Sequence, residues 1–127
     1  AREVDAVGFG YVLMRRGGGE ALRRTERVGQ QVSGVGQALA HGLAAHDVLA
    51  DGIPSTLITA ADITEARHLL PGADDPSVIE LRQGGGFART VNVDPALAAF
   101  VGACDGELTV GQIAAALADA GVTVLTP

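Results

Sequence analysis

Apolar and polar positions follow a clear strand-and-turn pattern between residues 78 and 93. Val78, Ile79 and Leu81 lead into the run QGGG at 83–86, and residues 88–93 return rich in β-branched side chains. Two short apolar runs joined by a glycine turn are typical of a β-hairpin. The pattern therefore predicts two antiparallel strands in this stretch.

A helix is predicted to start directly after this hairpin. Asp94 can accept a hydrogen bond from a free amide of the first turn, and Pro95 suits the first helical position because its missing N–H would have no partner there. Asp105-Gly106 predicts a tight turn after the helix. The predicted apolar face follows the spacing i, i+3, i+4 and i+7, and comprises Leu97, Phe100, Val101 and Cys104.

A second helix is predicted to begin after Thr109. Thr109 and Gln112 have the spacing of a capping box, and Leu108 and Ile113 have the spacing of a hydrophobic staple. Residues 122–125 are predicted to form a final strand. Hairpin, helix, turn and helix together indicate part of a winged-helix module.

The middle of the chain gives weaker patterns. Apolar residues recur with helical spacing from Val35 to Leu43, which predicts a helix over 33–46. Three interior glycines weaken such a helix by up to ~1 kcal/mol each relative to alanine, so we expect packing to hold it. Residues 57–70 are predicted to be mostly extended, although 62–70 fits a helix equally well.

The N-terminal residues carry a different pattern. Residues 4–16 (VDAVGFGYVLMRR) are apolar on both alternating sets, which is typical of a strand buried on both faces. Such a strand needs a sheet to lie in, so we expect the chain to be part of a larger protein. Residues 20–28 are predicted to form an exposed strand that pairs with 7–14, and 17–19 a turn or linker.

Charge and composition limit the possible partners. The chain has nine arginines, no lysine and fifteen acidic residues, a formal charge of −6. Non-specific nucleic-acid binding rests on cations that meet phosphates, so this balance disfavours it. Three Phe, one Tyr and no Trp also argue against a base-stacking platform.

The compartment is predicted from Cys104 and from hydropathy. A single cysteine excludes an internal disulfide and fits a reducing cytoplasm, and we expect it to pack as a small apolar residue. No apolar run approaches the ~20 residues that a bilayer requires, and no signal peptide pattern is present. We therefore expect a cytoplasmic protein that does not bind membranes.

Cofactor and metal motifs are incomplete in this sequence. Residues 5–10 lack the third glycine of a dinucleotide loop, and residues 83–86 lack the Lys-Ser/Thr of a phosphate loop. Two of the three histidines are five apart rather than four, and turn chemistry explains Asp74 and Asp75. We predict no catalytic, cofactor-binding or metal-binding residue in this chain.

Four arginines are the predicted contacts for an anion or a substrate. Arg82 and Arg89 flank the glycine turn and could hold an anion or a nucleic-acid backbone at the hairpin tip. Arg15 and Arg16 end the first apolar run and could act in the same way. The alternative is that all four only mark solvated strand ends.

Three segments resemble the C-terminal portion of actinobacterial class I S-adenosylmethionine-dependent methyltransferases of the small-domain, HemK-like kind. They are residues 7–16 (VGFGYVLMRR), 69–91 and 93–117, about half of the chain. In that family the first segment resembles the last strand of a Rossmann-like sheet, and the later ones form a winged-helix-like domain. The resemblance implies an α+β fold, with residues 1–28 left from an upstream catalytic domain and 29–127 as the winged-helix-like domain.

The same resemblance implies a function. The chain would be an accessory domain for substrate recognition or stability, not catalytic in isolation. The glycine-rich cofactor loop and the Asn-Pro-Pro-Tyr type motif of the family do not occur in this sequence. S-adenosylmethionine is therefore expected for the full-length parent and not for this chain.

The expected partners follow from that role. They are the upstream catalytic domain of the same polypeptide and a nucleic-acid or protein substrate. The alternative is an independent winged-helix module that binds nucleic acid or a peptide. A helix-turn-helix module would also require a third helix, and residues 118–127 do not predict one.

Overall fold

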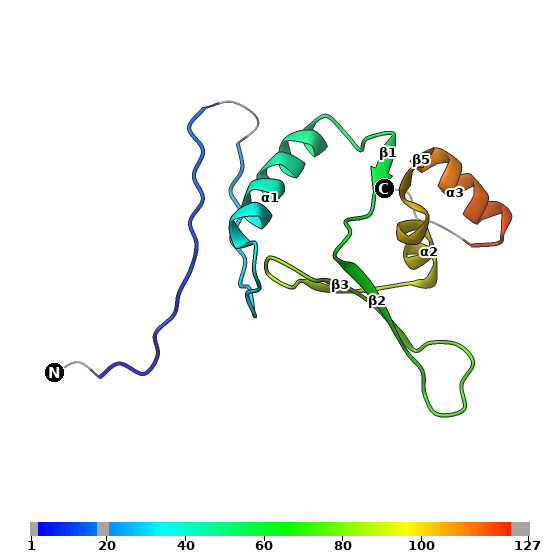
Figure 1. Ribbon diagram of the computed structural model, residues 1–127, viewed down its shortest axis with the longest axis horizontal. Helices are drawn as coiled ribbons and strands as arrows, with labels where there is room; N and C mark the ends of the chain where they lie inside the picture. The colour runs from blue at the N-terminus through cyan, green and yellow to red at the C-terminus, as the bar shows by residue number, and fades with distance from the viewer. Residues whose placement is uncertain (1–2, 18–20, 123–127) are drawn as a thin grey trace.

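The computed structural model describes residues 3–17 and 21–122, which divide into an extended arm, a helix and a folded body (Figure 1). We call residues 3–17 and 21–32 the arm and residues 56–122 the body. The described part is an α+β fold with three helices and two antiparallel sheets. The elements are α1 (Val35–Ala50), β1 (Thr56–Ile58), β2 (Ile63–His68), β3 (Val78–Gln83), β4 (Thr90–Val93), α2 (Pro95–Ala103), β5 (Asp105–Thr109) and α3 (Val110–Asp119).

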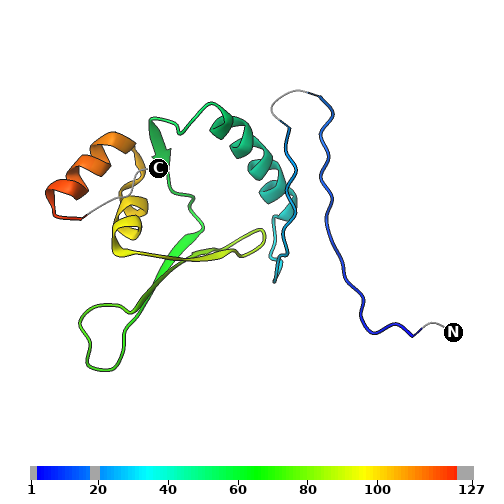
Figure 2. The ribbon, with the colours of Figure 1, turned by 180° about the vertical axis from the view of Figure 1, so that it is seen from behind.

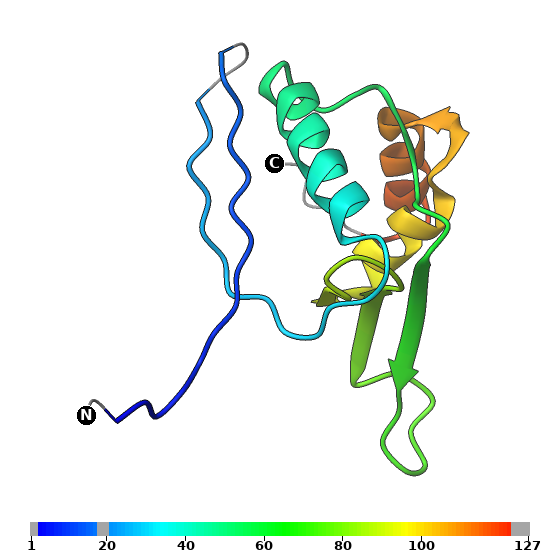
Figure 3. The same cartoon turned by 60° about the vertical axis from the view of Figure 1, so that its left-hand side comes forward.

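The predicted hairpin is confirmed as β3 and β4, which pair in an antiparallel register. β2 adds to the other side of β3, so the strand order is β2-β3-β4. This pairing decides between the two interpretations of residues 62–70, because β2 is extended along β3 from Ile63 to His68. The β2–β3 hairpin extends away from the rest of the body, with its loop at the far end (Figures 1 and 3).

The three-stranded sheet has an apolar and a polar face, as strand alternation requires. Ile79 lies opposite Val93, and Leu81 lies opposite Val91, so these four side chains share one face. We call this the inner face. Ile79 is buried there, and α2 packs against β3 and β4. The helix α2 therefore covers only part of the inner face, and Val91 on this face stays exposed.

Both predicted helix caps are confirmed. The Asp94 carboxylate accepts a hydrogen bond from the Leu97 amide at 2.7 Å, and Pro95 opens α2. At the start of α3, the Thr109 hydroxyl accepts from the Gln112 amide at 3.1 Å, while the Gln112 side chain accepts from the Thr109 amide at 2.8 Å. The short-range sequence signals thus place the first residue of each helix.

The apolar face predicted for α2 is wrong at one position. Cys104 is buried, but Leu97 is 43% exposed, and Ala96 and Ala98 are buried instead. The helix packs against β3 and β4 and also against α3, so its buried surface is wider than a single stripe. Small alanine side chains allow these close approaches.

The segment between α2 and α3 is a strand and not only the predicted tight turn. β5 pairs with β1, with Thr56 opposite Thr109 and Ile58 opposite Asp105. Gly106 has φ +89°, and a Cβ there would lie 2.9 Å from Ile58 Cγ1. The glycine that was predicted to end a helix therefore also allows β1 to approach.

The predicted helix over 33–46 is confirmed and extends further, as the 16-residue α1. Gly34 is its N-cap with φ +88° and not an interior residue. None of its residues is fully buried, so the expectation that packing holds this helix stays a prediction. Val35, Leu39 and Leu43 are only half-buried, and the helix lies between the arm and the body (Figure 3).

The two strands predicted in the N-terminal part of the chain are wrong for the described residues of the arm. Every described residue of 3–17 is exposed, and neither 3–17 nor 21–32 contains a strand. The two limbs instead run extended alongside each other, seen from either side (Figures 1 and 2). A strand that is apolar on both faces needs neighbouring strands and cover on both faces of its sheet, and no strand of the two described sheets pairs with the arm.

Three predictions fall wholly or partly outside the described residues. They are the turn at 17–19, the first residue of the strand at 20–28 and most of the strand at 122–125. Gly17 is described and has φ +66°, as in a turn. Across residues 3–17 and 21–122, no helix combines the length and the apolar character needed to cross a bilayer.

Candidate functional site

A groove of about 730 Å³ lies between the arm and the inner face of the three-stranded sheet. We call it the arm groove. The sheet, α2 and the residues that flank the glycine turn line one side, and residues 26–30 of the arm line the other. The apolar lining residues are Val28, Ile63, Leu81, Phe87, Val91 and Val101.

The floor of the arm groove is apolar because of strand register. Leu81 and Val91 are direct cross-strand neighbours, and Ile63 comes from β2. Val91 is 56% exposed, although it lies beside half-buried Leu81. Burying an exposed valine side chain is worth roughly 1.5–3 kcal/mol, so a partner that covers this floor would gain free energy.

The arm is tethered across the groove. Val28 is half-buried there, and the Val32 amide donates to the Gly86 carbonyl at 2.8 Å. Tyr11 meets the Phe87 ring edge-on, with the ring centroids 6.0 Å apart. These contacts keep the wall formed by residues 26–30 next to the glycine turn.

Charged side chains close one end of the groove. Glu26 accepts from Arg24 at 2.7 Å and also pairs with Arg89, whose guanidinium lies 5.5 Å from the Phe87 ring centroid. The hydrogen bond from Arg24, followed by the charge of Arg89, lowers the pKa of Glu26 below its ordinary value despite some desolvation. All three charges contact water, so these pairs position the arm more than they stabilise it.

The glycine turn holds protein groups and not a ligand. The Gly84 amide donates to the Asp62 carbonyl at 2.8 Å, and the Gly85 amide donates to the Asp62 carboxylate at 3.0 Å. Gly86 donates to the Ser33 carbonyl at 3.1 Å, and a Cβ on Gly86 would lie 2.7 Å from that of Ala38. The turn therefore connects the start of α1 to the sheet.

The four predicted arginines do not form one anion site. Arg82 pairs with Glu80 at 2.9 Å on the outer face of β3, while Arg89 points to the inner face. Arg15 donates to both carboxylate oxygens of Asp47 in α1, one of them at 2.8 Å. Arg16 is exposed next to it. Whether these residues contact an anion stays a prediction.

The pairing of Arg15 with Asp47 changes both pKa values. The hydrogen bond to Asp47 raises the pKa of Arg15, and the same bond lowers the pKa of Asp47. Arg15 is therefore already paired with Asp47 of α1, which leaves less of its charge for a ligand.

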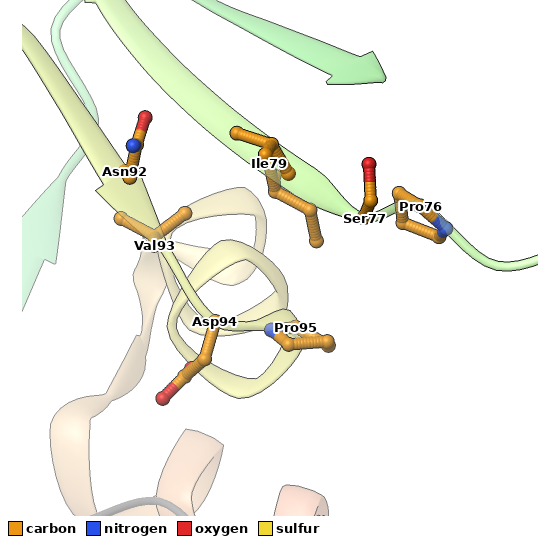
Figure 4. A pocket seen from close by; sticks show the side chains of 8 residues that line it. Pro76, Ser77, Ile79, Asn92, Val93, Asp94 and Pro95 are labelled. Carbon is orange, nitrogen blue, oxygen red and sulfur yellow. The ribbon is translucent and has the colours of Figure 1, made fainter. Parts of the chain in front are cut away.

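A second hollow of about 350 Å³ lies beside the N-terminus of α2 (Figure 4). Pro76, Ile79 and Val93 form part of its lining. The Asp94 carboxylate already accepts from a first-turn amide, and Figure 4 shows its side chain at the start of α2, directed away from Ile79 and Pro76. An anion at this helix start would face that carboxylate, so the hollow is a poor anion site.

Cys104 is placed as predicted, buried in the body. Burial, followed by the charge of Asp105, raises the pKa of its thiol above the ordinary value. The thiol donates to the Phe100 carbonyl at 3.2 Å. A thiol kept protonated in this way is a packing residue and a poor nucleophile.

The described residues do not fit the cofactor that the resemblance implies. Gly8 and Gly10 lie in the exposed arm, where no helix follows them to present amides to a nucleotide. No cluster of three or more metal-ligating side chains occurs in the part of the chain described. That S-adenosylmethionine binds only the full-length parent stays a prediction.

The arm groove was missed at the sequence level. Its floor comes from three strands whose register the pattern does not specify, and its far wall comes from residues that were predicted to pair elsewhere. Phe87, directly after the glycine turn, was the available signal, because a buried aromatic there requires a partner from outside the hairpin.

Comparison of the chain with protein-family models, with curated proteins and with solved structures finds no match.

Proposed function

We propose that this chain is the C-terminal accessory domain of an S-adenosylmethionine-dependent methyltransferase, whose catalytic centre lies in an upstream domain. The carrying observation is the first limb of the arm, which is apolar on both alternating sets from Val4 to Met14 yet exposed throughout residues 3–17. The role of the accessory domain would be substrate recognition or stabilisation of the catalytic domain.

The exposed arm favours this proposal for an energetic reason. Its most exposed large side chain is Phe9 at 94%, and the other large apolar residues between Val4 and Met14 are exposed as well. Each such side chain gains roughly 1.5–3 kcal/mol when it is fully buried. A strand of a Rossmann-like sheet, with neighbours on both faces, would bury nearly all of them.

The body supports the winged-helix-like part of the proposal. A hairpin of β3 and β4 leads directly into α2, and β5 then leads into α3. A wing next to two closely packed helices is the arrangement that the sequence resemblance implies. The body contributes two helices, α2 and α3, and a third helix packed against them would complete such a domain.

The second candidate is an independent winged-helix module that binds nucleic acid or a peptide. The arm groove favours the peptide version, because its floor is apolar. The nucleic-acid version has less support, since Arg15, Arg82 and Arg89 already pair with carboxylates and the net charge is −6.

Calorimetric titration of S-adenosylmethionine tests the first proposal. The 127-residue chain and a chain extended by the upstream coding sequence are titrated in parallel. We expect binding by the extended chain alone. Binding by neither chain would contradict the methyltransferase assignment, and binding by the short chain would contradict the accessory role.

A pair of substitutions tests the place of the arm. In the extended chain, Val12→Asp should lower the melting temperature by several degrees, because it places a charge inside a sheet. The same substitution in the 127-residue chain should change little, since Val12 is 87% exposed there. Val48→Asp on exposed α1 is the matched control for both chains. An equal, small effect of Val12→Asp in both chains would contradict the proposed strand.

A further inference from the structure

We infer that the free edge of β4, together with the arm groove, binds an extended peptide that has alternating apolar side chains and an acidic residue. The peptide would add to β4 as a fourth strand. This inference goes beyond the methyltransferase proposal and does not rest on it.

The first observation is the free edge of β4. The strand order β2-β3-β4 leaves β4 at the edge of its sheet. The Gln83 amide donates to the Arg89 carbonyl at 2.8 Å, so hydrogen-bonded pairs fall at the odd-numbered residues of β4. The backbone N–H and C=O groups of Thr90 and Asn92 therefore point away from β3. An added strand would satisfy them, as in other peptide-binding sheets.

The second observation is the groove beside this edge. A strand paired with β4 directs every second side chain to the inner face, next to Val91 and Leu81. The arm groove extends there over about 730 Å³ and has Val101 of α2 at its border. Apolar side chains at alternate peptide positions would fill it, while the side chains between them would face water.

The third observation is the charge of the lining. Arg27 and Arg89 line the groove together with a single carboxylate, that of Glu26, which pairs with Arg89. The lining therefore has an excess of one positive charge, that of Arg27, in a chain whose net charge is −6. An acidic side chain of the peptide complements this local excess, whereas a nucleic acid would meet the repulsion of the whole molecule.

The arm itself does not take the place of this strand. Residues 26–30 line the groove, but neither limb of the described arm forms a strand with β4. The ion pair of Glu26 with Arg89 and the hydrogen bond of Val32 to Gly86 hold the arm at the turn end of the hairpin. A peptide would lie beside β4 in the plane of the sheet, with its inner-face side chains directed into the arm groove.

The test uses the 127-residue chain and a labelled peptide, acetyl-Glu-Val-Thr-Val-Thr-Val-amide, in a fluorescence anisotropy titration. A peptide of the same composition with its three valines adjacent is the control, because it cannot alternate. We expect saturable binding of the alternating peptide, at least about tenfold tighter than that of the control. Equal binding of the two peptides would overturn the inference.

Hydrogen exchange followed by NMR identifies the edge that is used. On binding, the amides of Thr90 and Asn92 should become protected, because they would then donate to the peptide backbone. No new protection at these two amides, despite binding, would overturn strand addition to β4.

Matched variants locate the floor of the site. Val91→Asp should weaken binding about tenfold or more, since its carboxylate would lose water against apolar side chains. Val78→Asp, on the same sheet but the opposite face, should change binding less than about twofold, because Val78 is exposed and outside the groove. Equal losses in the two variants would overturn the proposed location.

A backbone variant tests the edge without a new charge. Thr90→Pro removes one outward N–H, and proline is tolerated on edge strands. Circular dichroism must show an unchanged fold for each variant. Unchanged peptide binding by folded Thr90→Pro would overturn the role of the edge. None of these titrations contains S-adenosylmethionine, so their outcome is independent of the cofactor test.

Discussion

The arm and the body place the same kinds of side chain in opposite environments. Phe9 of the arm is 94% exposed, whereas Phe87 of the body is 8% exposed. Both follow apolar or glycine-rich sequence that favours extended structure. The difference lies in the partners, since Phe87 meets Tyr11 and Arg89, while no strand pairs with the segment around Phe9.

Caps and hairpins form from residues that are close in the sequence, whereas an apolar strand pattern also needs a partner strand. In the body, β3 and β4 are close in sequence, and each cap lies within three residues of the amide that it satisfies. In the arm, an equally apolar pattern requires a sheet that neither limb provides. Apolar periodicity therefore indicates what a segment can become, and partners decide whether it does.

The largest expected effect comes from the core of the body. Ile113 is 2% exposed, so Ile113→Ala should destabilise the chain by roughly 2–5 kcal/mol through lost burial and a cavity. Phe9→Ala in the arm should cost less than about 0.5 kcal/mol. Urea unfolding measures both. Similar losses would show that the arm and the body are not energetically distinct.

The next effect concerns the connection between α1 and the sheet. Gly86→Ala should destabilise by about 1–3 kcal/mol, since φ is +60° and the new Cβ would approach Ala38. Gly42→Ala inside α1 has open space and should stabilise by up to ~1 kcal/mol. Thermal unfolding of the two variants compares them. A stabilising Gly86→Ala would mean that the turn does not hold α1.

Helix capping gives a smaller effect. Thr109→Ala removes the hydroxyl that accepts from the Gln112 amide, and should cost about 1 kcal/mol. Thr64→Ala, on an exposed position of β2, should cost about half of that or less. Urea unfolding distinguishes them. Equal costs would indicate that the capping box contributes nothing beyond a surface threonine.

The smallest effect is the pH dependence of the arm. Because the pKa values of Glu26 and Asp47 are lowered in the fold, their pairs contribute fully above the unfolded values and are lost as the pH falls through the folded ones, below about 4. NMR titration of the Glu26 carboxyl should give a midpoint below that of an unfolded peptide. Arg24→Gln should raise this midpoint, with Arg23→Gln as the control.

The outcome of this titration bears directly on the arm. An ordinary Glu26 midpoint would mean that the pair of Glu26 with Arg89 does not hold the arm. The pair of Arg15 with Asp47, the hydrogen bond of Val32 to Gly86 and the contact of Tyr11 with Phe87 would then be left to hold it.

Short-range chemistry made much of the body predictable. The hairpin around residues 84–86, the Asp94 cap and the capping box of Thr109 all depend on groups a few residues apart, so the sequence contains the whole of each interaction. The helix over 33–46 was also predicted. The candidate site was not predicted, because the arm groove joins segments that are far apart in the chain.

Tertiary structure decided what local pattern could not. Residues 62–70 fit helix and strand equally, and pairing with β3 selected the strand. β5 replaced a turn because β1 lay beside it, and Leu97 stayed exposed because α2 packs on two sides. Caps and tight turns depend on residues that are neighbours in the sequence, whereas sheet membership and burial depend on contacts between residues that are distant in the sequence.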